Sequence, residues 1–270
     1  MLKLIKCEFW KLKRRKFVVF TMLFSAVFPV FLSFALPMLN ADGTYGSTKI
    51  LLYDTFWQMV TGYGITFLMP CIIGVLSAIL FFMERDNGTF KNLRTIPVTS
   101  TRMIFAKIAV LFILAVVFCT LSTLFSAFAG MLMPQSFAVS GLAYKFMMSA
   151  VMGILITLGS MPLVLLVAFF SKNYLFSVML AIFYTVFSFL TCFGALGLPK
   201  LVVWCLPTPC ILMWSVYKMA SHMQLPAAKA LATFVERGLI PSTGQMLLPV
   251  CIIGAACIAL VIHLYKRRGE

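Results

Sequence analysis

No group of residues in this chain matches a known catalytic pattern. Its 270 residues include no His-x-x-x-His or Cys-x-x-Cys pair with metal-ligand spacing, no Gly-x-Ser-x-Gly turn to present a nucleophilic serine and no paired-carboxylate site. A Gly-x-x-x-x-Gly-Lys-Ser/Thr phosphate loop is also missing, so we expect the chain itself to bind no ATP. The sequence therefore predicts a protein that is not an enzyme and that holds no cofactor or metal.

The polar stretch of residues 84–102 has the spacing of a short helix tied between two longer ones. Gly88 can end the preceding helix in a left-handed cap, and Pro97 ends the short helix. Thr99 or Ser100 can cap the next long helix. The apolar residues at helical spacing in this stretch are Phe90, Leu93 and Ile96. The pattern predicts an amphipathic helix through which a partner could push on the long helices, although a solvated connector fits the loop equally well.

The composition places these residues in a membrane protein. Hydrophobic residues make up 62% of the chain and charged residues 11%, which excludes both a water-soluble protein and a disordered one. Six uncharged stretches reach the length of about 20 residues that a helix needs to cross the bilayer. None alternates with a period of two, so we expect an all-α integral membrane protein with one six-span domain over residues 17–265. The predicted spans are residues 17–39, 59–83, 108–132, 146–170, 174–196 and 247–265.

Basic residues gather beside these spans and predict the orientation. The chain has 22 Lys and Arg against 7 Asp and Glu, a net charge of +15 that points to a membrane surface rather than to nucleic acid. With six spans, most of the basic residues fall on the side of the N terminus, the 84–102 loop, Lys172 and the tail of residues 266–270. By the positive-inside rule, both termini are predicted to be cytoplasmic.

Residues 197–246 are then predicted to be external. Within them, residues 201–217 are uncharged, but Pro207 and Pro209 interrupt a stretch that is already short for a crossing. We therefore expect a re-entrant or interfacial segment, with a seventh span as the alternative because the charge count is the same for both. Cys205 and Cys210 share this segment, where they could pair or serve as small apolar residues.

The first 16 residues predict a helix that lies in the membrane interface. Apolar residues spaced by three or four form one stripe, which consists of Leu2, Ile5, Phe9 and Leu12. Lysines and arginines occupy most of the rest, and Trp10 suits the headgroup level. Such a helix is expected to hold its apolar side in the acyl boundary and its basic side among anionic headgroups. A simple orientation anchor for the first span explains the pattern equally well.

The predicted spans themselves contain no charged residue. Asp54 and Lys145 are expected at helix ends, which argues against a proton-coupled carrier and against a channel lined by charged rings. In the third span, Ser122, Ser126 and Gly130 recur every four residues and would let another helix approach closely. That helix could belong to a second copy, although this spacing is common in membrane helices of all kinds.

The layout resembles the membrane subunit of a type-2 ATP-binding-cassette (ABC) exporter. The residues that carry the resemblance are the pattern Glu84-x-x-x-Gly88-Thr89, the run Pro97-Val98-Thr99-Ser100 that leads to Lys107, and the basic amphipathic N terminus. The opening residues 1–14, MLKLIKCEFWKLKR, more narrowly resemble permeases of lantibiotic-immunity transporters. The layout is similar over nearly the whole chain, whereas the motifs are confined to the N terminus and the first cytoplasmic loop.

This resemblance implies a site and partners. Residues 87–96 would form a coupling helix that docks in a groove of an ATP-binding subunit, Glu84 would orient the loop, and the turn at residues 171–173 would make a second contact. The residues assigned to the ATPase contact in this way are Glu84, Asn87, Gly88, Thr89, Phe90, Leu93, Pro97 and Lys172.

The resemblance also implies how the chain works. ATP would be hydrolysed by the partner subunit, and a second permease would complete an assembly in the bacterial cytoplasmic membrane. Relatives of this kind expel lantibiotic peptides from the bilayer, whereas bacitracin-type exporters share the same layout. An immunity or scaffold protein that works without an ATPase is the alternative of another class. No substrate-contact residue is implied.

Overall fold

The computed structural model of the chain describes residues 2–13, 16–40, 44–86, 99–170, 174–197, 199–226 and 231–269. Every regular element in these ranges is a helix, and six helical stretches are long and apolar enough to cross a membrane. The predicted all-α fold with six spans is therefore confirmed. The helices up to residue 132 are α1 (Leu2–Lys13), α2 (Lys16–Leu39), α3 (Lys49–Gln58), the π-helix η1 (Met59–Ile65), α4 (Thr66–Asp86) and α6 (Ser100–Leu132).

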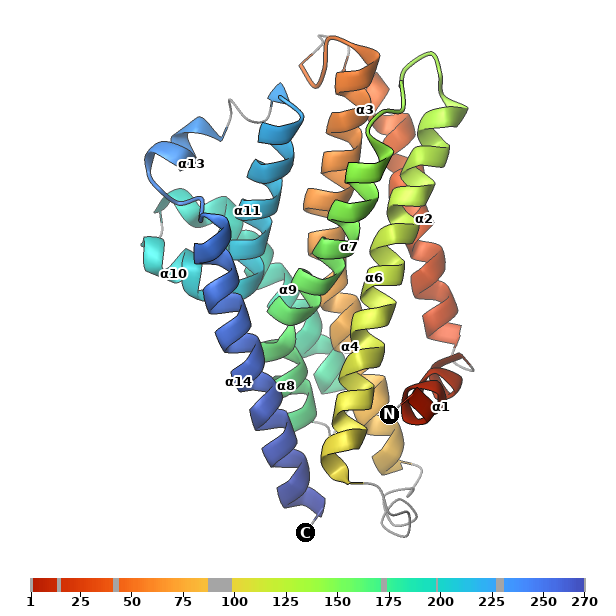
Figure 1. Ribbon diagram of the computed structural model, residues 1–270, viewed down its shortest axis with the longest axis vertical. Helices are drawn as coiled ribbons and strands as arrows, with labels where there is room; N and C mark the ends of the chain where they lie inside the picture. Colours follow the sequence, from red (N-terminus) through yellow and green to blue (C-terminus); the bar gives the residue numbers. More distant parts are fainter. Residues whose placement is uncertain are drawn as a thin grey trace.

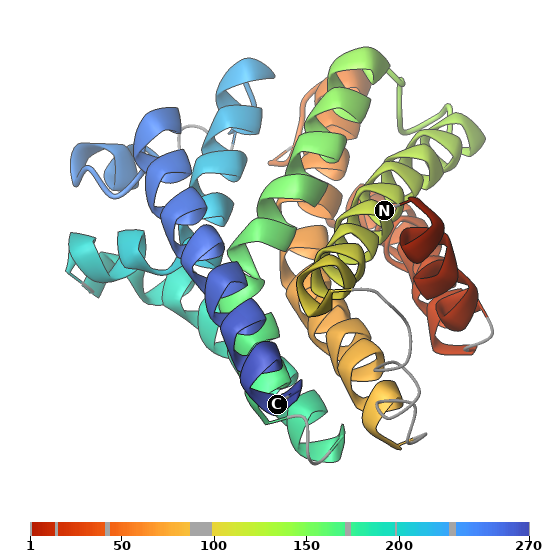
Figure 2. The ribbon, with the colours of Figure 1, turned by 60° about the horizontal axis from the view of Figure 1, so that its bottom comes forward.

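The remaining helices form the other side of the bundle (Figure 1). In chain order they are α7 (Leu142–Gly159), α8 (Met161–Phe169), α9 (Tyr174–Phe193), the 3₁₀ helix η2 (Gly194–Gly197), α10 (Lys200–Cys205), α11 (Pro207–His222), α13 (Ala232–Glu236) and α14 (Thr243–Gly269). Figure 2, turned to bring the α1 end forward, shows α1 and α2 on one side of the bundle, α14 on the other and α6 between them.

The second and third spans begin earlier than predicted. Helices α3, η1 and α4 follow one another without a break, so the second candidate span covers Lys49–Phe81 rather than residues 59–83. The third covers Thr101–Leu132 rather than residues 108–132. Both predicted spans began after a charged residue, because a charge was expected to lie outside the membrane. The structure buries these two residues, Asp54 and Lys107, inside the bundle.

The fourth span is interrupted. The predicted span of residues 146–170 is divided between α7 and α8, which meet at Ser160. Pro162 lies in the first turn of α8, where its ring blocks the helical hydrogen bond to the preceding turn. The Ser160 backbone N–H and hydroxyl both donate to the Ile156 carbonyl, at 2.9 Å and 2.7 Å, and so satisfy the end of α7.

Part of the segment before the last span, helix α11, packs inside the bundle, which fits the re-entrant alternative. Helix α11 runs from the middle of the bundle toward the end opposite α1 (Figure 1) and contacts α7, α9 and α14. It has 16 residues, fewer than the roughly 20 that a crossing needs. Cys210 in α11 is buried and Cys205 in α10 is exposed, and both are free thiols.

The small residues of the third span pack within the chain. Ser122 and Ser126 are buried, and a Cβ at Gly130 would lie 2.7 Å from the Tyr53 ring of α3. Gly130 therefore packs against α3, and the buried Ser122 and Ser126 are covered within the chain and do not present a surface to a second copy.

The outward faces of α2 and α9 are apolar. In the most apolar 18-residue stretch of α2, only 22% is buried inside the structure, and in that of α9 only 33%. Residues exposed on these faces include Phe20, Leu23 and Phe31 of α2 and Met179 and Phe183 of α9. Such surfaces require lipid or another membrane protein around them.

Candidate functional site

Most of the predicted ATPase contact lies outside the described residues. This applies to Asn87, Gly88, Thr89, Phe90, Leu93, Pro97 and Lys172. The structure does place the two helix ends that carry the 84–102 loop. Glu84 lies in the last turn of α4, which ends at Asp86, and Thr99 is the exposed N-cap residue of α6.

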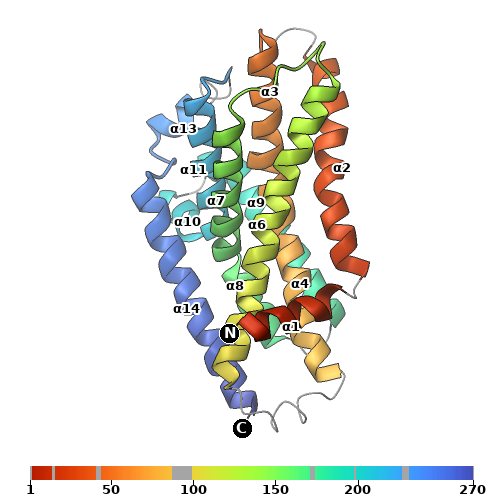
Figure 3. The same ribbon diagram turned by 45° about the vertical axis from the view of Figure 1, so that its right-hand side comes forward.

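Helix α1 lies across the bundle near these two helix ends. Figure 3 shows α1 crossing in front of α6 and α4 at the end of the bundle where α14 also finishes. Leu12 is buried in the main core, and Ile5 and Phe9 are half-buried against it. The apolar stripe of α1 is thus used largely for contact with the bundle. Leu2 and Trp10 remain 83% and 58% exposed and are the predicted anchor residues that can still reach lipid.

A buried charge contact fixes α1 to α6. The Nζ of Lys107 in α6 donates to Glu8 Oε2 in α1 at 3.3 Å and to the Leu80 carbonyl of α4 at 3.0 Å. Lys107 is fully buried and Glu8 is 6% exposed. The other carboxylate oxygen of Glu8 accepts from Lys11 at 2.6 Å. One ammonium group therefore joins α1 to both helices that carry the predicted coupling loop.

This contact can transmit force between the three helices. Removing one partner of a buried ion pair leaves an uncompensated charge, which costs about 3 to 5 kcal/mol. Helix α1 and the ends of α4 and α6 are therefore expected to move as one unit, because separating them would leave a buried charge without its partner.

The sequence carries a signal for this pair that apolar spacing alone does not reveal. Glu8 lies three residues after Ile5 and four before Leu12, so it shares their face of the helix. In a chain with 7 acidic and 22 basic residues, an acidic residue on that face needs a buried cation. Lys107 could have been proposed as that cation, since it directly precedes a long apolar run.

A second buried ion pair lies toward the opposite end of the bundle. Lys145 Nζ of α7 is 2.5 Å from Asp54 Oδ1 of α3 and also donates to the Ser140 carbonyl at 2.7 Å. Aromatic rings surround the ammonium group, with the centroid of Tyr53 at 4.1 Å and that of Trp57 at 6.0 Å. These contacts satisfy a cation in an apolar environment through a carboxylate, a carbonyl and two ring faces.

The aromatic residues around this pair and the neighbouring Gln58 link it to two further helices, α6 and α11. Trp57 donates from Nε1 to the Thr123 hydroxyl of α6 at 3.3 Å. The Tyr144 ring of α7 stacks on the His222 ring of α11 at a centroid distance of 3.9 Å. Gln58 donates from its amide to the Val216 carbonyl of α11 at 3.0 Å. The polar cluster thus fastens α11 to the spans.

The expectation of charge-free spans is wrong. Asp54, Lys107 and Lys145 all lie inside candidate spans. Lys145 lies in the first turn of α7, as expected of a helix end, but it is buried there, and Asp54 is buried in α3. Each has a buried partner of its own, so the physical reason for the exclusion still applies to unpaired charges. Among the described residues, no three His, Cys, Asp or Glu side chains form a group that could hold a metal ion.

These features define a class of protein. Six helices long and apolar enough to cross a membrane, with an amphipathic helix fastened across one end, are the architecture of a multi-pass membrane protein. Residues 4–188, more than half of the chain, match the ABC-2 family transporter protein family. The chain belongs to this family and is the membrane subunit of an ABC transporter, not its ATPase. The family implies an ATP-binding subunit as partner. A search of curated proteins gave no match.

Proposed function

We propose that this chain is one permease of an ABC transporter that expels a lantibiotic or similar antimicrobial peptide from the bacterial cytoplasmic membrane. It works with ATP-binding subunits and a second permease subunit, and it gives the cell immunity or resistance. Both ends of the chain face the cytoplasm.

The observation that carries the proposal is the joint between α1, α4 and α6. Lys107 of α6 contacts both Glu8 of α1 and the Leu80 carbonyl of α4. This contact lies about two turns from the ends of α4 and α6 that lead to the 84–102 loop. An ATP-binding subunit that docks on residues 87–96 and changes shape would move α4 and α6, and α1 would follow at the membrane surface. The basic residues of α1 keep this end at the cytoplasmic leaflet.

The surface of the chain suits a substrate that arrives through the bilayer. The outward faces of α2 and α9 are apolar, and the buried charges inside the spans, Asp54, Lys107 and Lys145, are paired. An amphipathic peptide in the outer leaflet could reach such faces without meeting an unpaired charge. The opening residues, which resemble lantibiotic-immunity permeases, favour a lanthionine peptide over bacitracin.

Co-expression with the neighbouring ATPase gene tests the proposal. Cells that carry both proteins are challenged with a lantibiotic and, separately, with bacitracin. Phe90→Asp places a charge on the predicted docking stripe and should abolish both complex assembly and resistance. Thr95→Asp adds the same charge on the face of the predicted helix opposite the stripe of Phe90, Leu93 and Ile96, so it should leave both intact.

Each outcome has a distinct meaning. Protection against bacitracin but not against the lantibiotic would assign the bacitracin-type substrate. Protection that persists with an inactive ATPase would assign sequestration without transport. Normal assembly and resistance with Phe90→Asp would show that the docking assignment is wrong.

A further inference from the structure

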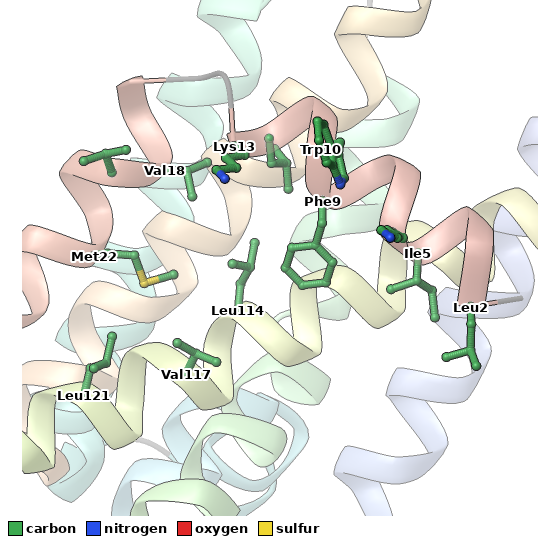
Figure 4. Close-up of a pocket in the computed structure, with 13 residues that line it drawn as sticks. Leu2, Ile5, Phe9, Trp10, Lys13, Val18, Met22, Leu114, Val117 and Leu121 are labelled. Carbon is green, nitrogen blue, oxygen red and sulfur yellow. The ribbon is translucent and has the colours of Figure 1, made fainter.

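An apolar cavity lies between the interfacial helix and the first and third spans. Its volume is about 710 Å³. Figure 4 shows side chains from three helices converging on one space: Ile5 and Phe9 from α1, Met22 from α2, and Leu114 and Val117 from α6. Buried side chains close the base of this cavity: Leu12 is 1% exposed and Leu114 is 7% exposed.

The cavity opens toward the region that lipid must occupy. Leu2 and Val19 on its edge are 83% and 60% exposed, and Val117 is 39% exposed. Beyond the edge, the outward face of α2 continues with exposed Leu23 and Val27. Water has few hydrogen-bond partners in a cavity lined by these side chains, so it does not fill the cavity stably. An occupant must be apolar and must enter from the bilayer.

The opening also carries positive charge. Lys6 and Lys13 of α1 are exposed and line the cavity, and none of the described residues that line it is acidic. The acidic side chain on α1, Glu8, is turned into the bundle and bound by Lys11 and Lys107. The ammonium groups of Lys6 and Lys13 therefore have no carboxylate among the lining residues, and Trp10 between them suits the headgroup level.

We propose that this cavity binds one anionic phospholipid, with an acyl chain between α1, α2 and α6 and its phosphate beside Lys6 and Lys13. An apolar cavity with a basic opening at an interfacial helix matches this ligand in both polarity and charge. The site is independent of which peptide the transporter moves. Its occupant supports α1 on the side away from the Glu8–Lys107 contact.

Native mass spectrometry of the full chain in detergent tests the site. Phosphatidylglycerol and phosphatidylcholine with identical acyl chains are added in turn, so that only the headgroup charge differs. One phosphatidylglycerol per chain should be retained, with phosphatidylcholine held more weakly. Lys6→Gln and Lys13→Gln should each lower the preference for phosphatidylglycerol about fivefold, whereas Lys3→Gln, on the same helix but outside the cavity, should not.

A second pair of variants tests the acyl position. Val117→Trp fills the cavity from its open side and should remove the retained lipid, while Leu124→Trp, exposed on the same helix but outside the cavity, should keep it. Equal retention of the two lipids would overturn the proposal. So would equal loss from Val117→Trp and Leu124→Trp, or a dimer that only Val117→Trp dissociates, because the cavity would then belong to a protein interface.

Discussion

Four buried charged residues, Glu8, Asp54, Lys107 and Lys145, link helices of this bundle, and each has a partner of opposite charge. Lys107 binds Glu8 and a carbonyl oxygen, and Lys145 binds Asp54 and a carbonyl oxygen. The sequence showed these residues but not their partners, because Glu8 and Lys107 are 99 positions apart and Asp54 and Lys145 are 91 apart. Only the packing of the helices brings the partners together. The sequence alone therefore predicts these charges at the ends of spans.

Glu8→Gln should destabilise the bundle by about 3 kcal/mol, because Lys107 would keep its charge without a carboxylate in a buried position. The free energy of unfolding in mixed micelles measures this loss. Glu8→Gln combined with Lys107→Met should recover most of it by removing the stranded charge. Lys3→Gln, exposed on the same helix, serves as the control, and an equal loss in that variant would contradict the assignment.

The Asp54–Lys145 pair should behave as a coupled unit. Asp54→Asn alone leaves the Lys145 ammonium buried among aromatic rings, so it should cost more stability than the double variant Asp54→Asn with Lys145→Met. A double-mutant cycle on thermal unfolding in detergent gives the coupling energy. Additive losses would mean that the two side chains do not depend on each other.

The helices show where sequence patterns succeed and where they fail. Apolar length alone predicted the number of spans and their order, because the bilayer sets that length. It did not predict the break at Ser160, where Pro162 lies in a continuous apolar run, and it left open whether residues 201–217 enter the bundle, as α11 does. Packing between helices decides these features. The predicted coupling loop stays a prediction, whereas the helix ends on either side of it are now placed.

The close approach of α6 and α7 gives a prediction at this scale. A Cβ at Gly153 would lie 2.8 Å from the Val116 Cα, so Gly153→Ala must push two backbones apart. We expect a loss of roughly 1 to 3 kcal/mol in the free energy of unfolding. Gly244→Ala in α14 has nothing within 4 Å of the added Cβ and should be neutral or slightly stabilising. Similar effects of the two substitutions would contradict the packing of α6 on α7.

The molecule as a whole has two unlike ends. One holds α1 and the end of α14, and the other holds the end of α2 and the start of α3 (Figure 1). The basic residues of α1 predict that the first end is cytoplasmic. The orientation follows from charge, whereas the fold follows from apolar length, so the two can be tested separately.

Cysteine labelling checks the orientation. In a chain without other cysteines, Cys7 should react with a membrane-impermeant maleimide only after cells are permeabilised, since it is exposed on α1. Ser47→Cys, exposed before α3, should react in intact cells. Labelling of Cys7 in intact cells would reverse the orientation and remove the basis for a cytosolic partner at residues 87–96.

The long separation between Glu8 and Lys107 also bears on biogenesis. Glu8 leaves the ribosome 99 residues before Lys107 does. When α1 first reaches the membrane, the nearest cation to the Glu8 carboxylate is therefore Lys11. A lysine at the centre of the bilayer costs about 2.5 to 3.5 kcal/mol, and Lys107, beside the interfacial helix α1, costs less than this. Because α1 is already at the membrane surface when the third span is inserted, Glu8 is available to Lys107 as soon as Lys107 reaches the membrane. We therefore expect the early synthesis of α1 to favour insertion of α6.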